Sequence, residues 1–540
     1  MTETDYTIQG YHQRTKHQLE RYARGPETLD WDNQPDPFRH FQGSPRRELP
    51  LPAAQDRTPY YQLSRAGERQ PQPLDRMHIG KLLELSMALS AWKSYGPDRW
   101  SLRINPSSGN LHPTECYLLL PPGAEISAGL YHYHSYAHEL EQRCDLQPRS
   151  EQLQAQLPGG TFIIGLSSIH KRESWKYGER AYRYCQHDVG HAVAAIRYAC
   201  AVLGWQLTLL DECSDAQIAH LLGLDRATDF SRAEHESPDL LLQIDSNAND
   251  VPRVDIDSLL QLAADCDWAG QANRLTDDNF YKWPVIQQAE AACSKPLTPA
   301  SQWLPTLASD LPACDASVAA ADIIRQRRSA QAFEAGAPPL PLQHFDRMLQ
   351  CLLPRAATPP LDCLPWAPRL HVILFVHRVE GLAPGLYALP RSEHGALLLR
   401  EQLRDEFAWE PVGGIGAPLF LLLGANAANS ARTLACHQPI ASDSAFSLAM
   451  LAEFDATLAS APWRYRQLHW EAGVIGQSLY LEAEAAGVRG TGIGCYFDDA
   501  VHELLGIRGS GLQDLYHFTV GTPRIDTRLQ SESAYGHLQR

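Results

Sequence analysis

The sequence has few of the features that mark several large classes of protein. It carries 63 acidic and 47 basic side chains, so its net charge is −16. That charge argues against a broad basic face for nucleic acid or an anionic membrane. The longest apolar runs, such as 418–423, are far shorter than the ~20 residues that span a bilayer. The first ten residues lack the basic segment and apolar core of a signal peptide. We expect a cytoplasmic protein with no nucleic-acid or membrane partner.

A metal or disulfide framework is also missing from the sequence. The twelve cysteines lie far apart, from Cys116 to Cys495, and no CxxC pair occurs. Free, mostly buried thiols are therefore expected. The segment YHYHSYAH (131–138) places His132 and His134 on one face of a predicted strand. No carboxylate or cysteine framework accompanies them, so we expect a surface strand and turn, and no metal site.

What the sequence does contain is enough material for two domains. It has 540 residues, of which 44% are apolar and 20% charged, as in ordinary globular proteins with more than one core. Residues 1–75 are rich in Pro, Gln and charge, and are expected to wrap the surface. The segment 286–318 holds several Pro, Ser and Ala residues and is interpreted as a linker. The predicted domains are therefore 76–285 and 319–540.

The first domain shows a readable order of elements. We predict a helix over 77–92, a loop over 103–113, and strands over 115–120 and 161–166. A long helix follows, whose apolar positions share one face and stop at Gly204, a suitable helix end. Those positions are Val189, Val193, Ile196, Cys200 and Leu203.

The second half repeats positions of the first half at a constant offset of 283, the difference in numbering between Gly190 and Gly473. Tyr182-Arg183, Gly190, Gly204 and LLGL (221–224) recur as Tyr465-Arg466, Gly473, Gly487 and LLGI (504–507). The tripeptide GLY recurs at 129–131 and 385–387, an offset of 256. This shared spacing predicts an internal duplication. Two similar halves are expected to pack as a pseudo-symmetric dimer within one chain.

Four segments resemble the nitroreductase superfamily of flavin enzymes. They are LRINPSSGNLHPTE (102–115), SWKYGERAYRY (174–184), RQRRSAQAF (325–333) and GTGIGCYFDD (490–499). The first two look most like the branch of azoline-oxidising dehydrogenases from thiazole/oxazole-modified peptide biosynthesis. The resemblance implies an α+β fold of two fused nitroreductase-like domains, each a mixed or antiparallel sheet flanked by helices, packed as an intrachain pseudo-dimer. It also implies FMN as the cofactor.

The segment RQRRSAQAF resembles the superfamily's opening phosphate-binding helix. Arg327 and Arg328 offer planar forks of donors and Ser329 adds a hydroxyl, which suits the dianionic phosphate of FMN. If the three residues open a helix, backbone N–H groups and the helix dipole add to the attraction. A solvated basic helix end is the alternative. Gln331 and Arg524 are included among the expected FMN contacts.

The segment GTGIGCYFDD resembles the loop that faces the flavin ring. Glycine lets a backbone approach a ring closely, so the main chain of Gly492, Ile493, Gly494 and Cys495 is expected to meet the isoalloxazine edge. A plain strand-to-helix turn is the alternative. Asp498 or Asp499 is expected to cap the next helix and to be structural.

The remaining flavin contacts are expected from the first half. Pro106, Ser107, Ser108 and Asn110 form a short polar loop that suits the ribityl hydroxyls and the polar ring edge, with a simple Ser/Asn turn as the alternative. Arg103 is a candidate cation near the N1/O2 edge of the ring. For Arg103 a surface ion pair is an equally good interpretation.

Lys176 and Tyr177 are the candidate catalytic residues. The resemblance to the peptide-modifying dehydrogenases implicates a lysine–tyrosine pair at this motif in catalysis. Lys176 would take a proton while hydride goes to the flavin, and Tyr177 would orient the substrate. A pair that snorkels at a helix entrance is the alternative.

Each half lacks what the other half has. At the offset of 283, the glycine loop faces TLLDECS (208–214), which places Asp211 and Glu212 at the ring position. At the offset of 256, Asn110 is replaced by Trp366. We therefore expect one composite site with one FMN per chain. The chain would need no second copy to complete it, and could be monomeric.

These expectations lead to an FMN-dependent two-electron oxidoreductase acting on a small molecule or a peptide. Three kinds of reaction remain open. They are a dehydrogenase of modified peptides, a nitro- or quinone-reductase with NAD(P)H as electron donor, and an oxygen-using enzyme that consumes flavin. A catalytically silent scaffold that binds a partner enzyme is the alternative of a different class.

Overall fold

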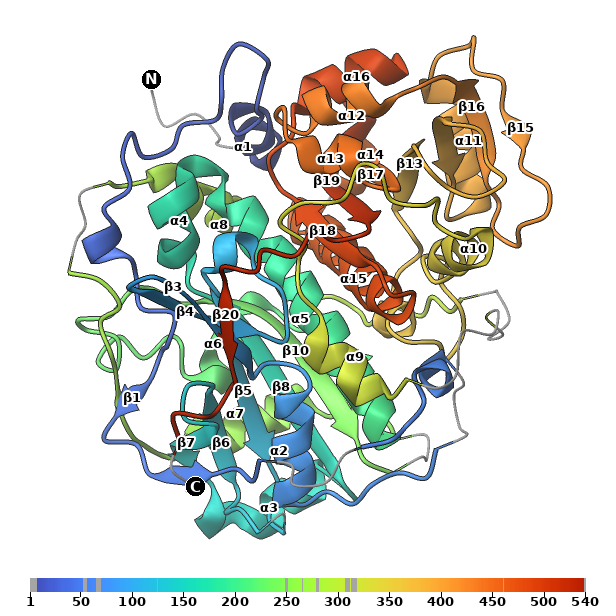
Figure 1. Ribbon diagram of the computed structural model, residues 1–540. Coiled ribbons are helices and arrows are strands. Elements are labelled where there is room, and N and C mark those ends of the chain that lie inside the picture. Colours follow the sequence, from blue (N-terminus) through green and yellow to red (C-terminus); the bar gives the residue numbers. More distant parts are fainter. Residues whose placement is uncertain are drawn as a thin grey trace.

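The chain folds into two α+β halves that meet along two long helices, α5 (Ala181–Leu203) and α15 (Arg464–Ala485) (Figure 1). The computed structural model describes residues 7–51, 56–64, 69–123, 125–247, 251–264, 266–277, 281–305, 311, 318–459 and 461–538. None of the helices within these ranges is long and apolar enough to cross a membrane.

Six strands follow the same order in the two main sheets, and each sheet adds a different strand at one edge. In the first half the order is β11-β7-β6-β5-β8-β10-β9, and in the second it is β15-β16-β14-β13-β17-β19-β18. The neighbouring strands pair antiparallel in both sheets. The first sheet consists of β5 (Thr114–Leu120), β6 (Gly129–His134), β7 (Glu139–Asp145), β8 (Thr161–Ser168), β9 (Gln206–Leu209), β10 (Ser237–Asp245) and β11 (Asp267–Trp268). The second consists of β13 (Leu370–Val376), β14 (Gly385–Leu389), β15 (Glu410–Pro411), β16 (Phe420–Gly424), β17 (Phe446–Glu453), β18 (Arg489–Ile493) and β19 (Leu512–Gly521). The predicted fold class is confirmed.

The helices repeat as well. The first residues of α6 (Asp215–Leu222) and α16 (Asp498–Leu505) are related by the offset of 283, and each helix ends on a left-handed glycine, Gly223 or Gly506. The remaining helices are α1 (Ile8–Arg14), α2 (Arg76–Glu84), α3 (Ser150–Gln156), α4 (His170–Tyr177), α7 (Ile256–Ala264), α8 (Pro284–Ala292), α9 (Ala320–Gln326), α10 (Leu342–Gln350), α11 (Glu393–Gln402), α12 (Ala428–Leu434), α13 (Pro439–Asp443) and α14 (Asp455–Leu458). The common element order accounts for the repeated sequence positions.

The backbones of α5 and α15 touch at two equivalent glycines. A Cβ on Gly190 would lie 2.2 Å from the carbonyl oxygen of Trp470, and a Cβ on Gly473 would lie 2.3 Å from that of His187. Both contacts are with backbone atoms, which cannot turn away. Only glycine permits this approach of the two helices.

Two reciprocal ion pairs join the halves beside this crossing. Arg183 lies 2.8 Å from Asp498, and Arg466 lies 2.7 Å from Asp215. The same offset of 283 relates the two pairs, with the halves exchanged. Such reciprocity is the property of a two-fold interface, in which each partner gives and receives the same contact.

Both ends of the chain reach across to other elements. In the N-terminal extension, β1 (Phe41–Gln42) pairs with β12 (Gln271–Ala272) and β2 (Arg46–Glu48) pairs with β7. Its helix α1 is more than a surface wrap, because Ile8, Tyr11 and His12 are buried. At the other end, β20 (Gln530–Glu532) pairs with β3 (Leu89–Tyr95), which also pairs with β4 (Asp98–Arg103) (Figure 1). The C-terminal arm therefore packs on the first half.

Two sequence expectations differ from the structure. The helix predicted over 77–92 is α2 followed by strand β3, because the turn at Gly96 (φ 58) reverses the chain and lets β3 pair with β4. This pairing overrides the helical pattern of the last part. The expected linker, 286–318, begins inside α8. Its residues 306–310 and 312–317 lie outside the described ranges, as do 1–6, 52–55 and 65–68 of the N-terminal extension.

Candidate functional site

A cavity of about 570 Å³ lies between the two halves and is lined by both. The first half contributes the loop after β4 and residues of α4 and α5, and the second half contributes the segment after α9 and the strand β18. Every residue that the sequence predicts as an FMN contact lines it: Arg103, Pro106, Ser107, Ser108, Asn110, Arg327, Arg328, Ser329, Gln331, Gly492, Ile493, Gly494, Cys495 and Arg524. The structure thus brings residues far apart in the sequence to one place.

One end of the cavity is rich in cations. Lys93, Arg327, Arg328 and Arg489 line it. Burial lowers the pKa of Arg327, and burial together with Arg327 lowers that of Arg328 to about 10. Burial, Arg328 and Arg489 also lower the pKa of Lys93. Glu484 lies 3.4 Å from Arg489 and offsets only part of this charge. A dianionic group would relieve the mutual repulsion of the four cations.

The arginines follow a helix, so the condition under which a helix dipole would assist them is not met. Arg327 is the C-cap of α9. The guanidinium of Arg328 donates to the carbonyl oxygens of Arg325 (2.8 Å), Arg327 (2.6 Å) and Ser90 (3.0 Å). A helix C-terminus carries negative partial charge, so no helix dipole assists an anion here. The attraction must come from the side chains alone.

Arg103 is a buried residue of this wall. Its guanidinium lies 5.7 Å from the ring centre of Phe38, and its backbone oxygen accepts a hydrogen bond of 3.0 Å from Arg327. Burial lowers the pKa of Arg103 to about 10. The alternative of a surface ion pair is therefore wrong for Arg103. The contact between Arg103 and Arg327 links the two halves at the cavity.

The polar loop of the first half is held by its own side chains. The amide of Asn110 donates to the carbonyl oxygen of Ser101 (2.8 Å), and its oxygen lies 2.9 Å from Nε2 of His112. The backbone N–H of His112 donates to the hydroxyl of Ser107 (2.8 Å). Asn110 also has a positive φ of 61°. Asn110 therefore shapes the loop, which is a role that the sequence does not reveal.

Asp188 of α5 holds the same loop in place through two hydrogen bonds. It accepts hydrogen bonds of 3.0 Å from both the backbone N–H and the hydroxyl of Ser108. Burial raises the pKa of Asp188 to about 7. Glu173 of α4 is also buried, and its pKa is raised by burial and by Asp188. Burial thus favours the protonated form of two carboxyl groups, one on Asp188, which lines the cavity, and one on Glu173, which does not.

Lys176 and Tyr177 occupy the end of α4, and only Tyr177 lines the cavity. The tyrosine hydroxyl lies against Gly109, where a Cβ would come within 2.4 Å of it. The ring of Tyr177 meets that of Tyr184 edge-on at 4.7 Å. The ammonium of Lys176 lies 5.5 Å from the Tyr177 ring centre and opposes the rise in the pKa of Glu173.

The edge strand β18 presents its glycines to tyrosine side chains. A Cβ on Gly492 would lie 1.9 Å from the hydroxyl of Tyr516, and one on Gly494 would lie 2.4 Å from the ring of Tyr184. The hydroxyl of Tyr480 accepts the N–H of Gly492 (3.0 Å). Glycine is therefore required here by close packing with tyrosines.

Asp498 is structural, as expected, but it does not cap a helix. The N-cap of α16 is Phe497, and Asp498 is the first helical residue. Its buried carboxylate lies 3.1 Å from Arg180 and 2.8 Å from Arg183, and these two arginines hold its pKa well below the usual range. The N–H of His17 also donates to it (3.1 Å). Asp498 thus joins the N-terminal extension to both halves.

The symmetry-related position in the second half is filled by side chains. Trp366, which replaces Asn110, is buried and lies 6.5 Å from the Trp470 ring. Glu471 is the equivalent of Asp188 at the offset of 283, and it forms a buried ion pair with Arg391.

Other ion pairs complete this filling. Arg197 is the equivalent of Tyr480 at the offset of 283, and its guanidinium lies 2.7 Å from the carboxylate of Asp362. Asp211, expected at the vacant ring position, lies 3.2 Å from Arg253. The charges that would meet a second flavin are thus already paired.

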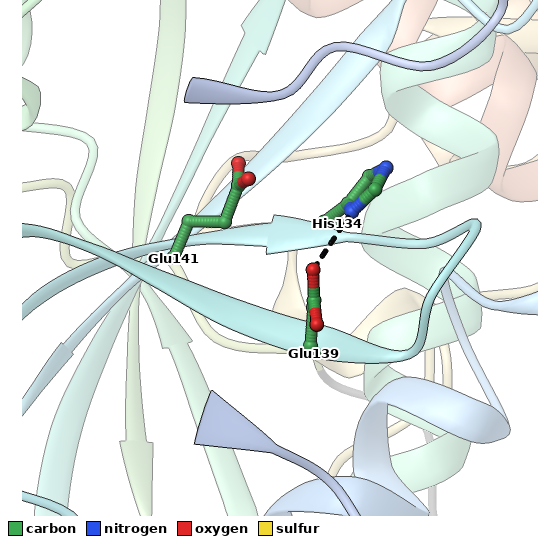
Figure 2. Close-up of side chains that lie close together, drawn as sticks. All are labelled: His134, Glu139 and Glu141. Atoms are coloured by element: carbon green, nitrogen blue, oxygen red, sulfur yellow. Dashed lines mark hydrogen bonds and ion pairs between the residues drawn. The ribbon is translucent and has the colours of Figure 1, made fainter. Parts of the chain in front are cut away.

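The histidine cluster differs from the expectation of a surface strand and turn. His132 is fully buried between Glu115 (2.9 Å) and Glu141 (3.1 Å). Figure 2 shows His134 hydrogen-bonded to Glu139, with Glu141 beside them on the same hairpin. Carboxylates therefore do surround the histidines. Arg46 contacts both Glu139 (3.1 Å) and Glu141 (3.4 Å), so the group is an ion-pair network.

Several cavity residues were not found from the sequence. They are Lys93, Tyr184, Asp188, His191, Gln438, Tyr480, Arg489 and Tyr516. Two of these residues could have been found from the sequence. Tyr184 ends the segment SWKYGERAYRY, and Arg489 directly precedes the glycine loop. The others have no local motif around them in the sequence.

Comparisons with known proteins agree with this architecture. Residues 70–231 match the model of the Nitroreductase family. A putative nitroreductase from Anabaena variabilis ATCC 29413 shares the fold over 96% of this chain and 100% of its own, with a TM-score of 0.68 and 21% identity. The chain therefore has a nitroreductase fold, with the family signature in its first half.

Two further solved structures match parts of the chain. A putative nitroreductase from Ralstonia eutropha JMP134 is 20% identical, covers 42% of this chain and 99% of its own, and has a TM-score of 0.27. The E. coli microcin synthetase complex is 21% identical, covers 38% of this chain and 71% of its own, and has a TM-score of 0.26. None of the curated proteins matches the chain.

Proposed function

We propose that the chain is an FMN-dependent two-electron oxidoreductase with one flavin site, the cavity between its halves. The observation that carries this proposal is the joining of a cationic cluster and a glycine edge from the second half to a polar loop from the first half. Neither half presents all three parts. FMN has a dianionic phosphate, a hydroxylated ribityl chain and a flat ring. The cationic cluster would suit the phosphate, the polar loop the ribityl chain, and the glycine edge the ring.

The residues present fit FMN in charge and in hydrogen bonding. Arg327, Arg328 and Lys93 would hold the phosphate, since their charge exceeds what Glu484 offsets. Ser329, whose hydroxyl lies 2.8 Å from that of Tyr480, would bind a neighbouring polar group of the cofactor. Bound FMN would supply the two-electron chemistry. The protein would orient the cofactor and exclude water from it.

For the substrate, we favour a dehydrogenase of modified peptides. Tyr177 lines the cavity and is held rigidly between Gly109 and Tyr184, so it can orient a substrate over the ring. Lys176 lies next to it but does not line the cavity, so its side chain would have to swing toward the substrate to take a proton from it. The resemblance of 174–184 to the azoline-oxidising branch supports the same choice. NAD(P)H as donor to a nitro compound or quinone is the second candidate.

The test uses flavin-free protein titrated with FMN by quenching of flavin fluorescence, followed by turnover. We expect saturable binding and FMN-dependent oxidation of an azoline-containing peptide. Oxidation of NAD(P)H by a quinone, with no azoline oxidation, would select the reductase. Protein that binds no FMN would refute the proposal.

A further inference from the structure

Two cysteines lie next to each other at the edge of the cavity. Cys495 lines it, and Cys436 lies in the turn after α12, where it has a positive φ of 52°. Each thiol is close enough to shift the pKa of the other, that of Cys495 downward and that of Cys436 upward. Their loops are joined as well, because the N–H of Phe497 donates to the oxygen of Leu434 (2.8 Å) and the amide of Gln438 donates to that of Cys495 (3.2 Å). The two loops that carry the cysteines are therefore held against each other by the fold.

The surroundings favour a thiolate on Cys495. The hydrogen bond from Cys436 lowers the pKa of Cys495 most, His17 and Arg180 lower it further, and the pKa reaches about 5. Nδ1 of His17 accepts the N–H of Ala23 (2.9 Å), so the imidazole proton is on Nε2 and can be donated to Cys495. The hydrogen bond to Cys495 and burial raise the pKa of Cys436. These opposite shifts favour the thiolate on Cys495 and the thiol on Cys436.

Most other described cysteines lack this character. Burial raises the pKa of a further set of thiols, which comprises Cys116, Cys185, Cys200, Cys213, Cys293, Cys351 and Cys363. Cys144 and Cys266 also form a hydrogen-bonded pair, but neither lines the cavity. Within the described chain, proximity to the cavity and a lowered pKa coincide at Cys495.

We propose that Cys436 and Cys495 are a redox-active pair that stores two electrons and exchanges them with the flavin. This inference rests on the proposed function. A low-pKa thiolate beside a second thiol is the arrangement that thiol–disulfide chemistry uses. The glycine edge that leads into Cys495 places this residue on the same wall as the expected ring contacts.

The exchange balances without a further reactant. When the pair is oxidised, its S–S bond takes up two electrons and one proton and breaks, which leaves a thiolate on Cys495 and a thiol on Cys436. The electrons and the proton come from the reduced flavin monoanion, which returns to its oxidised form. In the reverse direction the thiolate and thiol lose two electrons and one proton to oxidised flavin, and the S–S bond forms.

The direct test is an anaerobic dithionite titration of the oxidised, FMN-loaded protein. The wild type should take up about four electrons per flavin, since the flavin and the disulfide are each a two-electron couple. Cys436→Ser should take up about two. Cys144→Ser, which removes the other hydrogen-bonded pair, should still take up about four. Wild-type protein that binds FMN and takes up only two electrons would overturn this inference alone.

A second readout does not depend on the flavin. Peptide mapping of the oxidised wild type should find Cys436 and Cys495 linked. The rate at which iodoacetamide alkylates Cys495 in the reduced protein should rise with a midpoint near pH 5. Absence of the linked peptides, or a midpoint above pH 8, would also overturn the inference. Protein that takes up no FMN would overturn it together with the proposed function.

Discussion

At the scale of single residues, the cationic end of the cavity concentrates the charge that a phosphate would meet. Arg328 is half-buried there, and Arg327 and Lys93 lie near it. A charge-assisted hydrogen bond contributes roughly 1.5–3 kcal/mol. Arg328→Ala should therefore weaken FMN binding by about 10- to 100-fold, as measured by flavin fluorescence.

The neighbouring Arg325 is the matched control for this change. It is paired with Glu84 at 2.6 Å and does not line the cavity. Arg325→Ala removes the same charge from the same segment, so it should leave the affinity for FMN nearly unchanged. Equal loss in the two variants would show that general charge, and not the cavity site, attracts the cofactor.

Lys176 belongs to the chemistry in this account. Lys176→Ala should keep bound FMN and thermal stability, since the side chain does not line the cavity, but steady-state turnover should fall by about 100-fold or more, as for loss of a general base. Flavin content, melting temperature and turnover are measured on the same preparation. Full activity in this variant would mean that the Lys176–Tyr177 pair has a structural role and no catalytic one.

Asp188 should make stability depend on pH. Its folded pKa of about 7 is above the ordinary value of about 3.9. Between these two values the folded state keeps a proton that the unfolded state has lost. The free energy of unfolding therefore falls as pH rises through this window, by up to about 1.4 kcal/mol per pH unit.

Asp188→Asn should remove that slope, because an amide does not titrate and its oxygen can still accept the Ser108 N–H. Urea denaturation at pH 5 and pH 8, at matched flavin content, measures the effect. The variant should gain stability relative to wild type as pH rises. Identical pH dependence in both proteins would mean that Asp188 is ionised in the fold.

At the scale of secondary structure, the contact between α5 and α15 holds the halves in place. Gly190→Ala puts a methyl group 2.2 Å from a backbone oxygen of Trp470. The helices must then separate, and overpacking of this kind costs about 1–3 kcal/mol or more. Thermal unfolding should show a clear loss. Gly336→Ala, at a glycine with no heavy atom within 4 Å, should be nearly neutral.

The helices were the part of the fold that the sequence predicted best. The repeat was visible at helix-ending glycines such as Gly204, because a left-handed backbone position leaves few other residues possible. The prediction over 77–92 was wrong because strand pairing is decided by distant residues. The sequence alone does not decide whether the arginines at 327–328 open a helix, and in the structure the helix lies before them, at 320–326.

Residues of the candidate site were predicted only where they belong to a short, continuous sequence motif. Loop residues such as Ser108 and Gly492 stand in recognisable segments. Tyr480 and Tyr516 do not, because they reach the cavity from a helix and a strand of the second half. The histidine network was missed for the same reason: Glu141 meets His132 through the pairing of two strands.

At the scale of the whole molecule, the two halves have unequal roles. Six strands follow the same order in both sheets, yet the positions that line the cavity in one half are replaced in the other by Trp366 and by the Arg391–Glu471 and Arg197–Asp362 ion pairs. The chain joins its own halves as two copies would join in a symmetric dimer. It should therefore keep its flavin as a monomer when diluted.

The central claim is that each chain holds one FMN between its halves. The most direct measurement is the ratio of flavin released on denaturation to protein chain, after saturation with FMN and removal of the excess. A ratio close to one is predicted. Asn110→Ala in the first half and Ser329→Ala in the second should each lower the affinity of this one site. A ratio close to two, or no bound flavin, would contradict the account.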